Sequence, residues 1–200
     1  MLSLSLCRLL FFNLIREKFR DAEMLLFNSA FALSRLEDTG TVTPEAALQI
    51  GLVGLAARAS GIDRDVRVDF PYGMYRYSNV SSTLLESGDV YARAKMRSLE
   101  VEQSIEFILE QLDNLPASKP KDREKNLRPN SLVVSLTEGH RGEIAHVVLT
   151  DASGKLSQVK IKDPSFHNWQ GLSIAERENG ISDFPLCNKS FDLSYAGHDL

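Results

Sequence analysis

Apolar side chains recur at steps of three and four residues along two long stretches of the chain, which is the spacing of amphipathic helices. The first stretch runs from Leu14 to about Leu36 and ends at the polar turn 38–40. The second opens at Gly88-Asp89 and ends at Pro116, and its apolar positions alternate strictly in steps of three and four. That alternation is bundle spacing, so the sequence predicts two long helices of a helical bundle.

A shorter helix is predicted between these two, over about residues 44–58. Thr43 is a good N-cap, Pro44 suits the first helical position, and an acidic residue follows in the first turn. The helix carries Gly51 and Gly54 on one face, which lets another backbone come close. Two interpretations stay open, namely tight helix packing or a backbone approach near a functional site.

The pattern then changes to short β-branched or apolar runs, at Ser131–Thr137, Glu143–Thr150 and Leu156–Lys162. Glycine-rich turns separate the runs, so they predict a three-stranded antiparallel meander. Short helical or irregular pieces follow at 165–171 and 183–188. We therefore expect an α+β fold, predominantly α: a helical bundle with one small sheet and a packed C-terminal tail, forming a single domain over residues 1–200.

Four further segments have distinct compositions. Residues 63–77 combine alternating charges with three tyrosines, which indicates an ordered loop held against the core. Residues 117–130 are polar and rich in Lys, Pro and Asn, so we expect an exposed loop. The aromatic tail 190–200 is expected to tuck into the core. Residues 1–15 are apolar, but they lack the features of a signal peptide and are too short for a membrane span, so we expect a helix end that leans on a partner.

Composition narrows the function classes. The 200 residues are 43% hydrophobic and 25% charged, which excludes collagen-like and wholly disordered chains. The formal net charge of −4 gives no general basic surface for nucleic acid. Cys7 and Cys187 form no disulfide framework and are too few for a four-thiolate metal site, which indicates a reducing compartment.

Common catalytic motifs are missing: no nucleophile elbow, no phosphate-binding glycine loop and no helix-borne histidine pair occurs. Three clusters remain as candidates for chemistry. They are Glu138–Glu143 with His146, Arg58–Asp69, and the tail 190–200. In the first, glycines flank His140 and Arg141, so the planar guanidinium of Arg141 could reach an anionic ligand or a carboxylate. A solvated hairpin tip is the alternative.

In this order, the clusters resemble the C-terminal half of the nickel-iron hydrogenase large subunit superfamily. That superfamily includes energy-converting hydrogenases and the quinone-site, 49-kDa subunit of respiratory complex I. The resemblance runs from about residue 20 to the tail. It rests on the stretches Arg35–Gly40, Gly51–Gly54, Ala57–Gly61, Arg64–Arg67, Asp69–Tyr72, Gly88–Arg93, Glu138–Gly142 with His146, and Asp183–Leu186.

The departures from this family concern its metal ligands. Hydrogenases of the superfamily end in a tail whose two cysteines bind nickel and iron, and here the matching positions are Ser194 and Gly197. Together with His146, they are vestigial metal-ligand positions in this comparison. Nickel in such sites depends on soft thiolates, so the resemblance implies that this chain holds no metal. Phe70 and His140 also differ from the residues usual in energy-converting hydrogenases, and the upstream half with the remaining ligands and the quinone-site histidine and tyrosine has no counterpart.

The resemblance implies a redox subunit without nickel. Arg141 matches the arginine held over the hydrogenase active site, and Arg141, Glu138, Arg67 and Asp69 are the expected lining of the former metal cavity. The implied acceptor is quinone-like, no cofactor is held by this chain alone, and a small iron-sulfur subunit supplies the electrons. Membrane-arm subunits are further partners, and the expected location is the cytoplasmic, inner face of the cell membrane. A non-catalytic scaffold or assembly module is the alternative, and a residual hydrogenase is a third.

Overall fold

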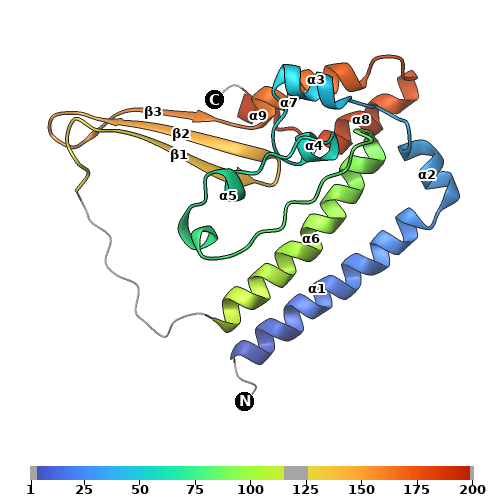
Figure 1. Ribbon diagram of the computed structural model, residues 1–200, viewed down its shortest axis with the longest axis horizontal. Coiled ribbons are helices and arrows are strands. Elements are labelled where there is room, and N and C mark those ends of the chain that lie inside the picture. Colours follow the sequence, from blue (N-terminus) through green and yellow to red (C-terminus); the bar gives the residue numbers. More distant parts are fainter. Residues whose placement is uncertain (1–3, 115–125, 199–200) are drawn as a thin grey trace.

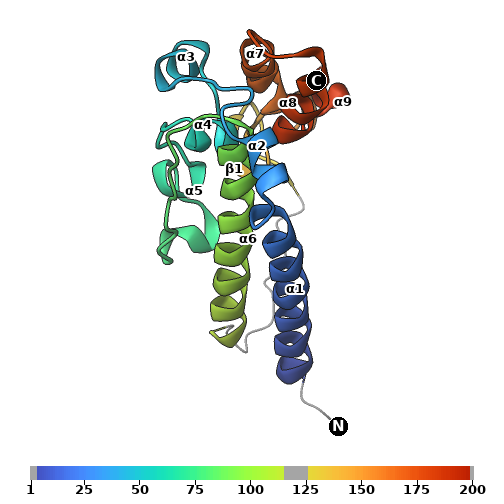
Figure 2. The same cartoon turned by 90° about the vertical axis from the view of Figure 1, so that its right-hand side faces the viewer.

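The computed structural model describes residues 4–114 and 126–198. Its outline has three parts (Figures 1 and 2). Two long helices, α1 and α6, lie side by side as an arm, a head of short helices sits where that arm ends, and a three-stranded sheet extends from the head. None of the helices in the described part of the chain combines the length and apolar character that a membrane crossing requires. The predicted α+β, mainly helical architecture is confirmed.

In chain order, the short helices α2–α5 lie between the two long helices α1 and α6, the sheet follows α6, and further short helices follow the sheet. The helices are α1 Leu4–Phe27, α2 Ala30–Leu36, α3 Pro44–Ile50, α4 Gly54–Ala59, α5 Val66–Asp69, α6 Val90–Asp113, α7 Ser165–Ala175, α8 Phe184–Phe191 and α9 Tyr195–His198, with 3-10 turns η1 Gly73–Arg76 and η2 Ile181–Asp183. The strands are β1 Leu132–Gly139, β2 Gly142–Thr150 and β3 Leu156–Lys162.

The first predicted helix is two helices in the structure. It begins at Leu4, in agreement with the helix end expected within residues 1–15, and it breaks at Asn28 before α2 starts. The hydroxyl of Ser29 accepts the N–H of Ala32 at 3.3 Å and so caps α2. The prediction of one continuous helix to Leu36 was wrong, because the three- and four-residue spacing continues across the break while the cap ends the hydrogen-bond ladder.

The predicted helix over 44–58 is likewise divided, into α3 and α4. Thr43 caps α3 as expected, with its hydroxyl accepting the N–H of Ala46 at 3.3 Å. Gly51 then adopts a left-handed conformation with φ of 68° and ends α3. A residue in this conformation terminates a helix, which a count of apolar positions does not reveal.

Helix α6 and the sheet agree with the prediction. Asp89 caps α6 by accepting the N–H of Ala92 at 2.7 Å, and the helix runs 24 residues without interruption. The strands pair in the antiparallel order β1-β2-β3, with Val134 opposite Val147 and Val148 opposite Val159. The sheet is therefore a meander of consecutive strands.

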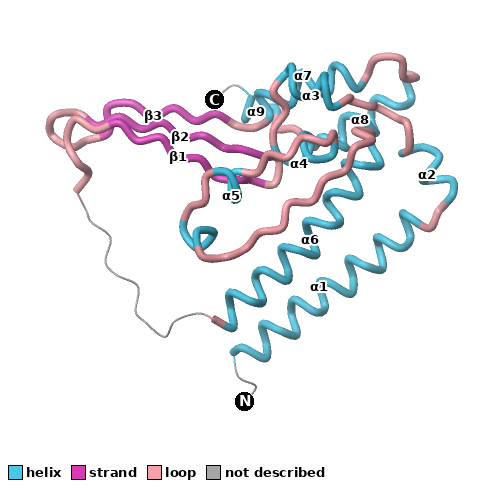
Figure 3. Tube along the Cα trace, viewed as in Figure 1, coloured by secondary structure: helices cyan, strands magenta, loops and turns pink. Residues whose placement is uncertain are grey.

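The segment between α4 and α6 runs back alongside α6 as a loop with two short helical turns (Figure 3). The ring of Tyr75 stacks on Phe107 of α6 with 5.4 Å between ring centroids, and Tyr72 meets Tyr75 edge-on. These aromatic contacts hold the loop against α6, as the tyrosine content predicts. Of the polar segment predicted as a second, exposed loop, residues 117–125 lie outside the described residues, and 126–130 are exposed.

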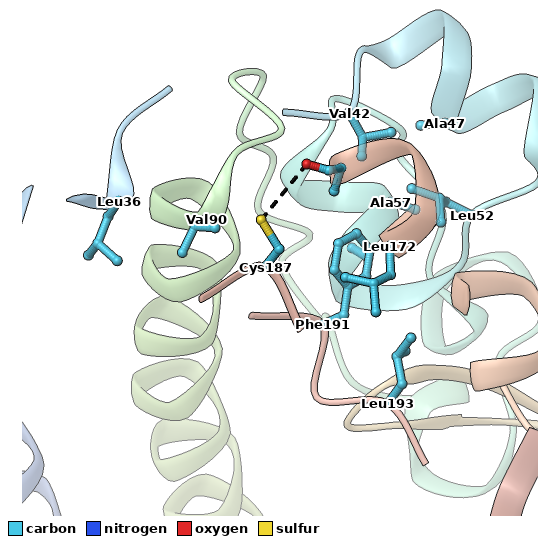
Figure 4. Close-up of a cluster of buried hydrophobic side chains, with 12 residues drawn as sticks. Leu36, Val42, Ala47, Leu52, Ala57, Val90, Leu172, Cys187, Phe191 and Leu193 are labelled. Carbon is cyan, nitrogen blue, oxygen red and sulfur yellow. Dashed lines mark hydrogen bonds between the residues drawn. The ribbon is translucent and has the colours of Figure 1, made fainter. Parts of the chain in front are cut away.

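The main core lies in the head, where the C-terminal helices meet the segment that precedes and follows α3 (Figure 4). Phe191 and Leu193 from the tail pack with Leu52 and Leu172, and Cys187 is fully buried beside them. Residues 190–193 of the tail are therefore part of the core, as predicted, and this packing brings Asp192 to the turn between β1 and β2. Tyr195 is 69% exposed, and residues 199–200 lie outside the described residues.

Candidate functional site

Arg58 is the centre of a buried charge cluster. This arginine of α4 is 2% exposed, and its guanidinium reaches carboxylates from three other segments. Nη2 donates to Glu100 of α6 at 2.5 Å, and Nη1 donates to Glu138 near the end of β1 at 3.0 Å. Asp65, the cap of α5, lies 3.5 Å from Nη1. One side chain therefore ties two helices, a strand and the start of α5 together.

Arg67 completes the cluster by pairing with Asp65 at 2.5 Å. Three carboxyl groups (Asp65, Glu100 and Glu138) then face two guanidiniums (Arg58 and Arg67), so the cluster carries one negative charge in excess when all three carboxyls are ionised. Burial raises the pKa of Glu138 above its ordinary value, and the attraction of Arg58 only partly offsets it. Burial also acts to raise the pKa of Asp65, but hydrogen bonds and charge from Arg67 and Arg58 bring it below its ordinary value. Glu138 therefore keeps its proton to a higher pH than Asp65 does.

A cavity of about 490 Å³ opens beside this cluster. Glu138, Arg67 and Arg58 line it, together with the hydrogen-bonding side chains of Tyr75 and His140. The rest of the wall comes mainly from α1, α4 and α6: Phe12, Ile15, Leu55, Arg97, Glu100, Val101, Ser104, Ile105 and Gly139. An apolar wall with a few convergent polar groups suits a flat, largely apolar ligand that carries oxygen atoms at its edge.

Arg141 lies on the tight turn that joins β1 to β2. Gly142 in this turn has φ of 133° and presses against the start of α4, because a Cβ atom on Gly54 would lie only 2.1 Å from the Gly142 Cα. Gly54 thus serves a close backbone approach next to Arg141, one of the two interpretations that its spacing left open. Gly51 instead ends a helix and has open space around it.

Asn168 of α7 holds this turn and was not singled out from the sequence. Its amide group, 2% exposed, accepts the N–H of Val53 at 3.1 Å and donates to the carbonyl of Val53 at 3.2 Å and to that of Arg141 at 3.3 Å. The sequence gives little signal for it, because α7 also carries Ser165, His167, Gln170 and Ser173, and nothing local shows which of these polar residues is buried against another segment.

The side chain of Arg141 points to the C-terminal tail. Its Nε donates to the carbonyl of Asp192, and Nη2 lies 3.8 Å from the Asp192 carboxylate. That carboxylate also pairs with Lys189 at 2.6 Å and lies 3.4 Å from His140. The hydrogen bond from Lys189 is the main reason why the pKa of Asp192 lies below its ordinary value. Arg141 is therefore joined to the tail two residues before Ser194.

Ser194 and Gly197 are next to each other at the start of α9. The Ser194 hydroxyl accepts the N–H of Gly197 at 2.9 Å, and the Ser194 N–H donates to Ser165 at 3.0 Å. A Cβ atom on Gly197 would lie 2.7 Å from the carboxyl carbon of Asp163, so any side chain at this position would require Asp163 to move. A hydroxyl already in use and a bare backbone supply none of the soft thiolate donors on which nickel of the hydrogenase type depends. Over residues 4–114 and 126–198, no three His, Cys, Asp or Glu side chains form a potential metal site.

Two other predicted residues, Asp69 and His146, are not among the described residues that line the cavity. The Asp69 carboxylate is exposed and accepts the N–H of Asp65 at 3.1 Å, so it stabilises α5. His146 lies in the middle of β2, and side-chain alternation along the strand places it on the face opposite that of Glu143. The structure therefore brings Arg67 and Glu138 to one cavity, joins Arg141 to the tail, and leaves Asp69 and His146 apart.

Comparison with protein families gives one match that covers nearly the whole chain. The model of the family described as respiratory-chain NADH dehydrogenase, 49 Kd subunit, matches residues 8–131 and 123–199. A subunit of the NADH-quinone oxidoreductase of Desulfotalea psychrophila is 30% identical over 172 residues, which are 81% of this chain and 46% of the relative. The corresponding NADH-quinone oxidoreductase subunit from Thermus thermophilus is 27% identical over 91% of this chain and 51% of its own length. The chain spans about half the length of the curated relatives it matches.

A solved structure gives the same comparison in three dimensions. A chain of the membrane-bound sulfane sulfur reductase, described as an archaeal respiratory membrane complex, superimposes with a TM-score of 0.85 at 28% identity. The match covers 94% of this chain and 53% of the other. The helical arm, the head and the sheet therefore recur together in a protein about twice as long.

Proposed function

Because this chain belongs to the family of the 49-kDa subunit of respiratory-chain NADH dehydrogenase, we propose that it is a subunit of a membrane-attached respiratory oxidoreductase complex. In that complex it helps to pass electrons from a partner iron-sulfur subunit to a quinone-like acceptor. The proposal is supported by the relatives that are named as subunits of NADH-quinone oxidoreductase and by the similar chain of an archaeal respiratory membrane complex.

The cavity beside the Arg58 cluster is the observation that supports a quinone-like electron acceptor. Its aliphatic and aromatic wall suits a quinone ring, and Tyr75, His140 and Arg67 offer hydrogen-bond donors for the quinone oxygens. A strongly polar or highly charged acceptor fits this wall less well, because most of its surface would lose water without gaining partners.

Quinone reduction needs protons as well as electrons. Converting one quinone to a quinol takes up two electrons and two protons, and the electrons come from the iron-sulfur cluster of the partner. Glu138 is our candidate donor for one of the protons, because it lines the cavity and burial raises its pKa. After it loses the proton, the carboxylate keeps its hydrogen bond from Arg58 at 3.0 Å. The second proton and the refilling of Glu138 come from solvent.

We also propose that no nickel-iron centre forms on this chain. The support is the donor chemistry at Ser194 and Gly197, where a capping hydroxyl and a glycine replace sulfur. Arg141, which the family resemblance compares with the arginine above the hydrogenase metal, instead contacts the tail at Asp192. In this proposal, Arg141 orients the tail beside the acceptor site.

The proposed partners are a small iron-sulfur subunit and membrane-arm subunits, with the chain peripheral on the cytoplasmic face. The exposed apolar surface of α1 supports a docked partner. Leu10, Phe11 and Leu14 are each more than half exposed, and Leu25 is 80% exposed. Single exposed apolar residues are ordinary, but a row of them along one helix marks an interaction surface.

A non-catalytic scaffold in such a complex is the second candidate. The observation that favours it is length, since the chain corresponds to about half of each compared relative. In this case the fold would connect the iron-sulfur subunit to the membrane arm, and the Arg58 cluster would serve stability alone.

The test uses the purified complex that contains this chain. Its iron-sulfur clusters are reduced chemically, a short-chain quinone is added, and quinol formation is followed by absorbance. We expect Glu138→Gln to slow quinol formation about 100-fold, the lower end for a positioned acid, with quinone binding retained. Arg141→Ala should abolish turnover.

The control is Lys155→Gln, in the exposed turn between β2 and β3, away from both cavities and from the exposed face of α1. It should leave the rate unchanged. Unchanged turnover in both the Glu138 and the Arg141 variants would favour the scaffold. Stoichiometric nickel in the purified complex would contradict the loss of the metal centre.

A further inference from the structure

A second cavity, of about 460 Å³, lies further along the crevice between α1 and α6, where α8 closes it. Apolar side chains from all three helices line it, including Phe19 and Leu26 of α1, Ala94 of α6 and Leu186 of α8. Arg97 of α6 lines this cavity and also the cavity beside Arg58. A single guanidinium is thus shared by two neighbouring cavities.

The carboxylates around the second cavity form salt bridges with lysines, and Arg97 is in neither of these pairs. Glu23 binds Lys95 of α6 at 2.7 Å, and Asp192 binds Lys189 at 2.6 Å. Among the described residues, no carboxylate oxygen lies within 4.0 Å of the Arg97 guanidinium. Its hydrogen-bond partner is neutral, because Nη1 donates to a backbone carbonyl of α6 at 3.2 Å.

The environment of Arg97 disfavours the charged form of its guanidinium. Burial lowers the pKa of the guanidinium, and the positive charge of Arg141 adds to this effect, although Asp192 and Glu100 act against it at longer range. A partly buried cation without a contact counter-ion loses hydration without replacing it. An anion bound in the cavity would supply the missing counter-ion.

We propose that the second cavity binds an amphipathic anion, whose carboxylate or phosphate head pairs with Arg97 and whose apolar chain lies between α1, α6 and α8. Charge complementarity selects the head, since Arg97 has donors free for a planar oxyanion and Lys189 lies at the same cavity. The apolar lining selects the chain, because a small hydrophilic anion would leave Phe19, Leu26 and Leu186 uncovered. A free fatty acid and an anionic phospholipid share this chemistry.

The second cavity shares Arg97 with the proposed acceptor cavity, but it can be blocked at a position that lines only the second one. Ala94 lines the second cavity and is not among the described residues that line the first. A larger side chain at Ala94 therefore tests anion binding in the second cavity without replacing a residue that lines the proposed acceptor site.

The experiment labels the purified complex with a photoreactive dodecanoate in non-ionic detergent and identifies labelled peptides of this chain by mass spectrometry. We expect labels on α1, α6 and α8 around the second cavity. Unlabelled dodecanoate should compete about tenfold better than dodecanol, because only the carboxylate can form a charge-assisted bond to Arg97. This comparison uses the unmodified protein, so it does not depend on the folding of any variant.

Variants then locate the head and the chain of the ligand. Arg97→Gln should reduce labelling about tenfold, with Arg97→Lys retaining most of it, and Ala94→Phe should block the cavity while quinol formation continues. Lys155→Gln, in the exposed turn between β2 and β3, should label normally. Competition by phosphatidylglycerol vesicles, but not by phosphatidylcholine vesicles, would identify a phospholipid as the source, and competition by dodecanoate alone would identify a free acid.

Three results would overturn the proposal. Equal competition by dodecanol and dodecanoate would show that the head group does not matter. Unchanged labelling in Arg97→Gln would remove the arginine from the site. Absence of labelling on all three helices in the intact complex would mean that a protein partner fills the cavity.

Discussion

Replacing Arg58 by methionine removes the positive centre of the buried cluster and leaves three carboxylates facing one another. The lost contacts are two hydrogen bonds to Glu100, one to Glu138 and one to the backbone carbonyl of Arg64. The carboxylate side chains of Asp65 and Glu138 are 1% and 4% exposed, so water replaces the guanidinium only poorly. Breaking a buried ion pair from one side costs about 3–5 kcal/mol. In a chain of this size, that loss lowers Tm by about 6–20 °C.

The measurement is thermal unfolding of the wild type and Arg58→Met by circular dichroism, at about pH 5 and about pH 8. Without Arg58, the pKa values of the buried carboxyls should rise above those of the unfolded chain. The variant then loses stability as the pH rises, so its deficit should be larger at pH 8 than at pH 5. Arg64→Met is the control, because its pair with Glu143 is partly exposed and contributes at most about 1 kcal/mol. Equal Tm shifts in the two variants, or a deficit that does not change with pH, would refute this account.

Three further predictions concern single positions. Gly54→Ala should lower Tm strongly, because its Cβ atom would lie 2.1 Å from a backbone atom. Gly51→Ala is the control: this position has open space around it, so the variant should show only the cost of its left-handed backbone. Equal Tm shifts in the two variants would contradict the close approach. Asn168→Ala should cost about 2–4 kcal/mol and speed amide exchange around Arg141, since three hydrogen bonds are lost. Because the pKa of Asp65 lies below its ordinary value, its stabilisation is lost only as the pH falls through that lowered value. Acid titration should therefore destabilise the wild type more than Asp65→Asn, and parallel curves would contradict this.

The helix boundaries show which ends of a helix can be predicted from the sequence and which cannot. Helix α6 was predicted almost to the residue, because its cap and its terminating proline are local signals. The predicted helices over 14–36 and 44–58 each proved to be two. The apolar spacing continues across the breaks because α1 and α2 both pack against α6, and because α3 and α4 both contribute to the main core. Ser29 and Gly51 nevertheless end the hydrogen-bond ladders. Serine is a common N-cap residue, so Ser29 could have indicated a helix start. The residues on both sides also favour a helix, however, and a continuous helix was therefore predicted.

The candidate site was only partly accessible from sequence. Family resemblance pointed to Arg67, Glu138 and Arg141, and the first two do line one cavity. The importance of Glu100 could not be predicted, since an acid on the polar face of a long helix is usually solvated. Asn168 likewise gains its role only from contacts with backbone groups of two distant segments.

By itself, the amino-acid sequence determined the elements and the available chemistry: periods of three to four and of two, the caps and turns, and the lack of cysteines at Ser194 and Gly197. These are local properties, set by the conformational preference of each residue and by which atoms it carries. Only the tertiary structure decided which charges are buried together, since Arg58 binds carboxylates that are 42 and 80 residues away along the chain. The free energy and the pKa of a buried charge depend on its neighbours in space, and those neighbours are defined only once the helices and the sheet have packed.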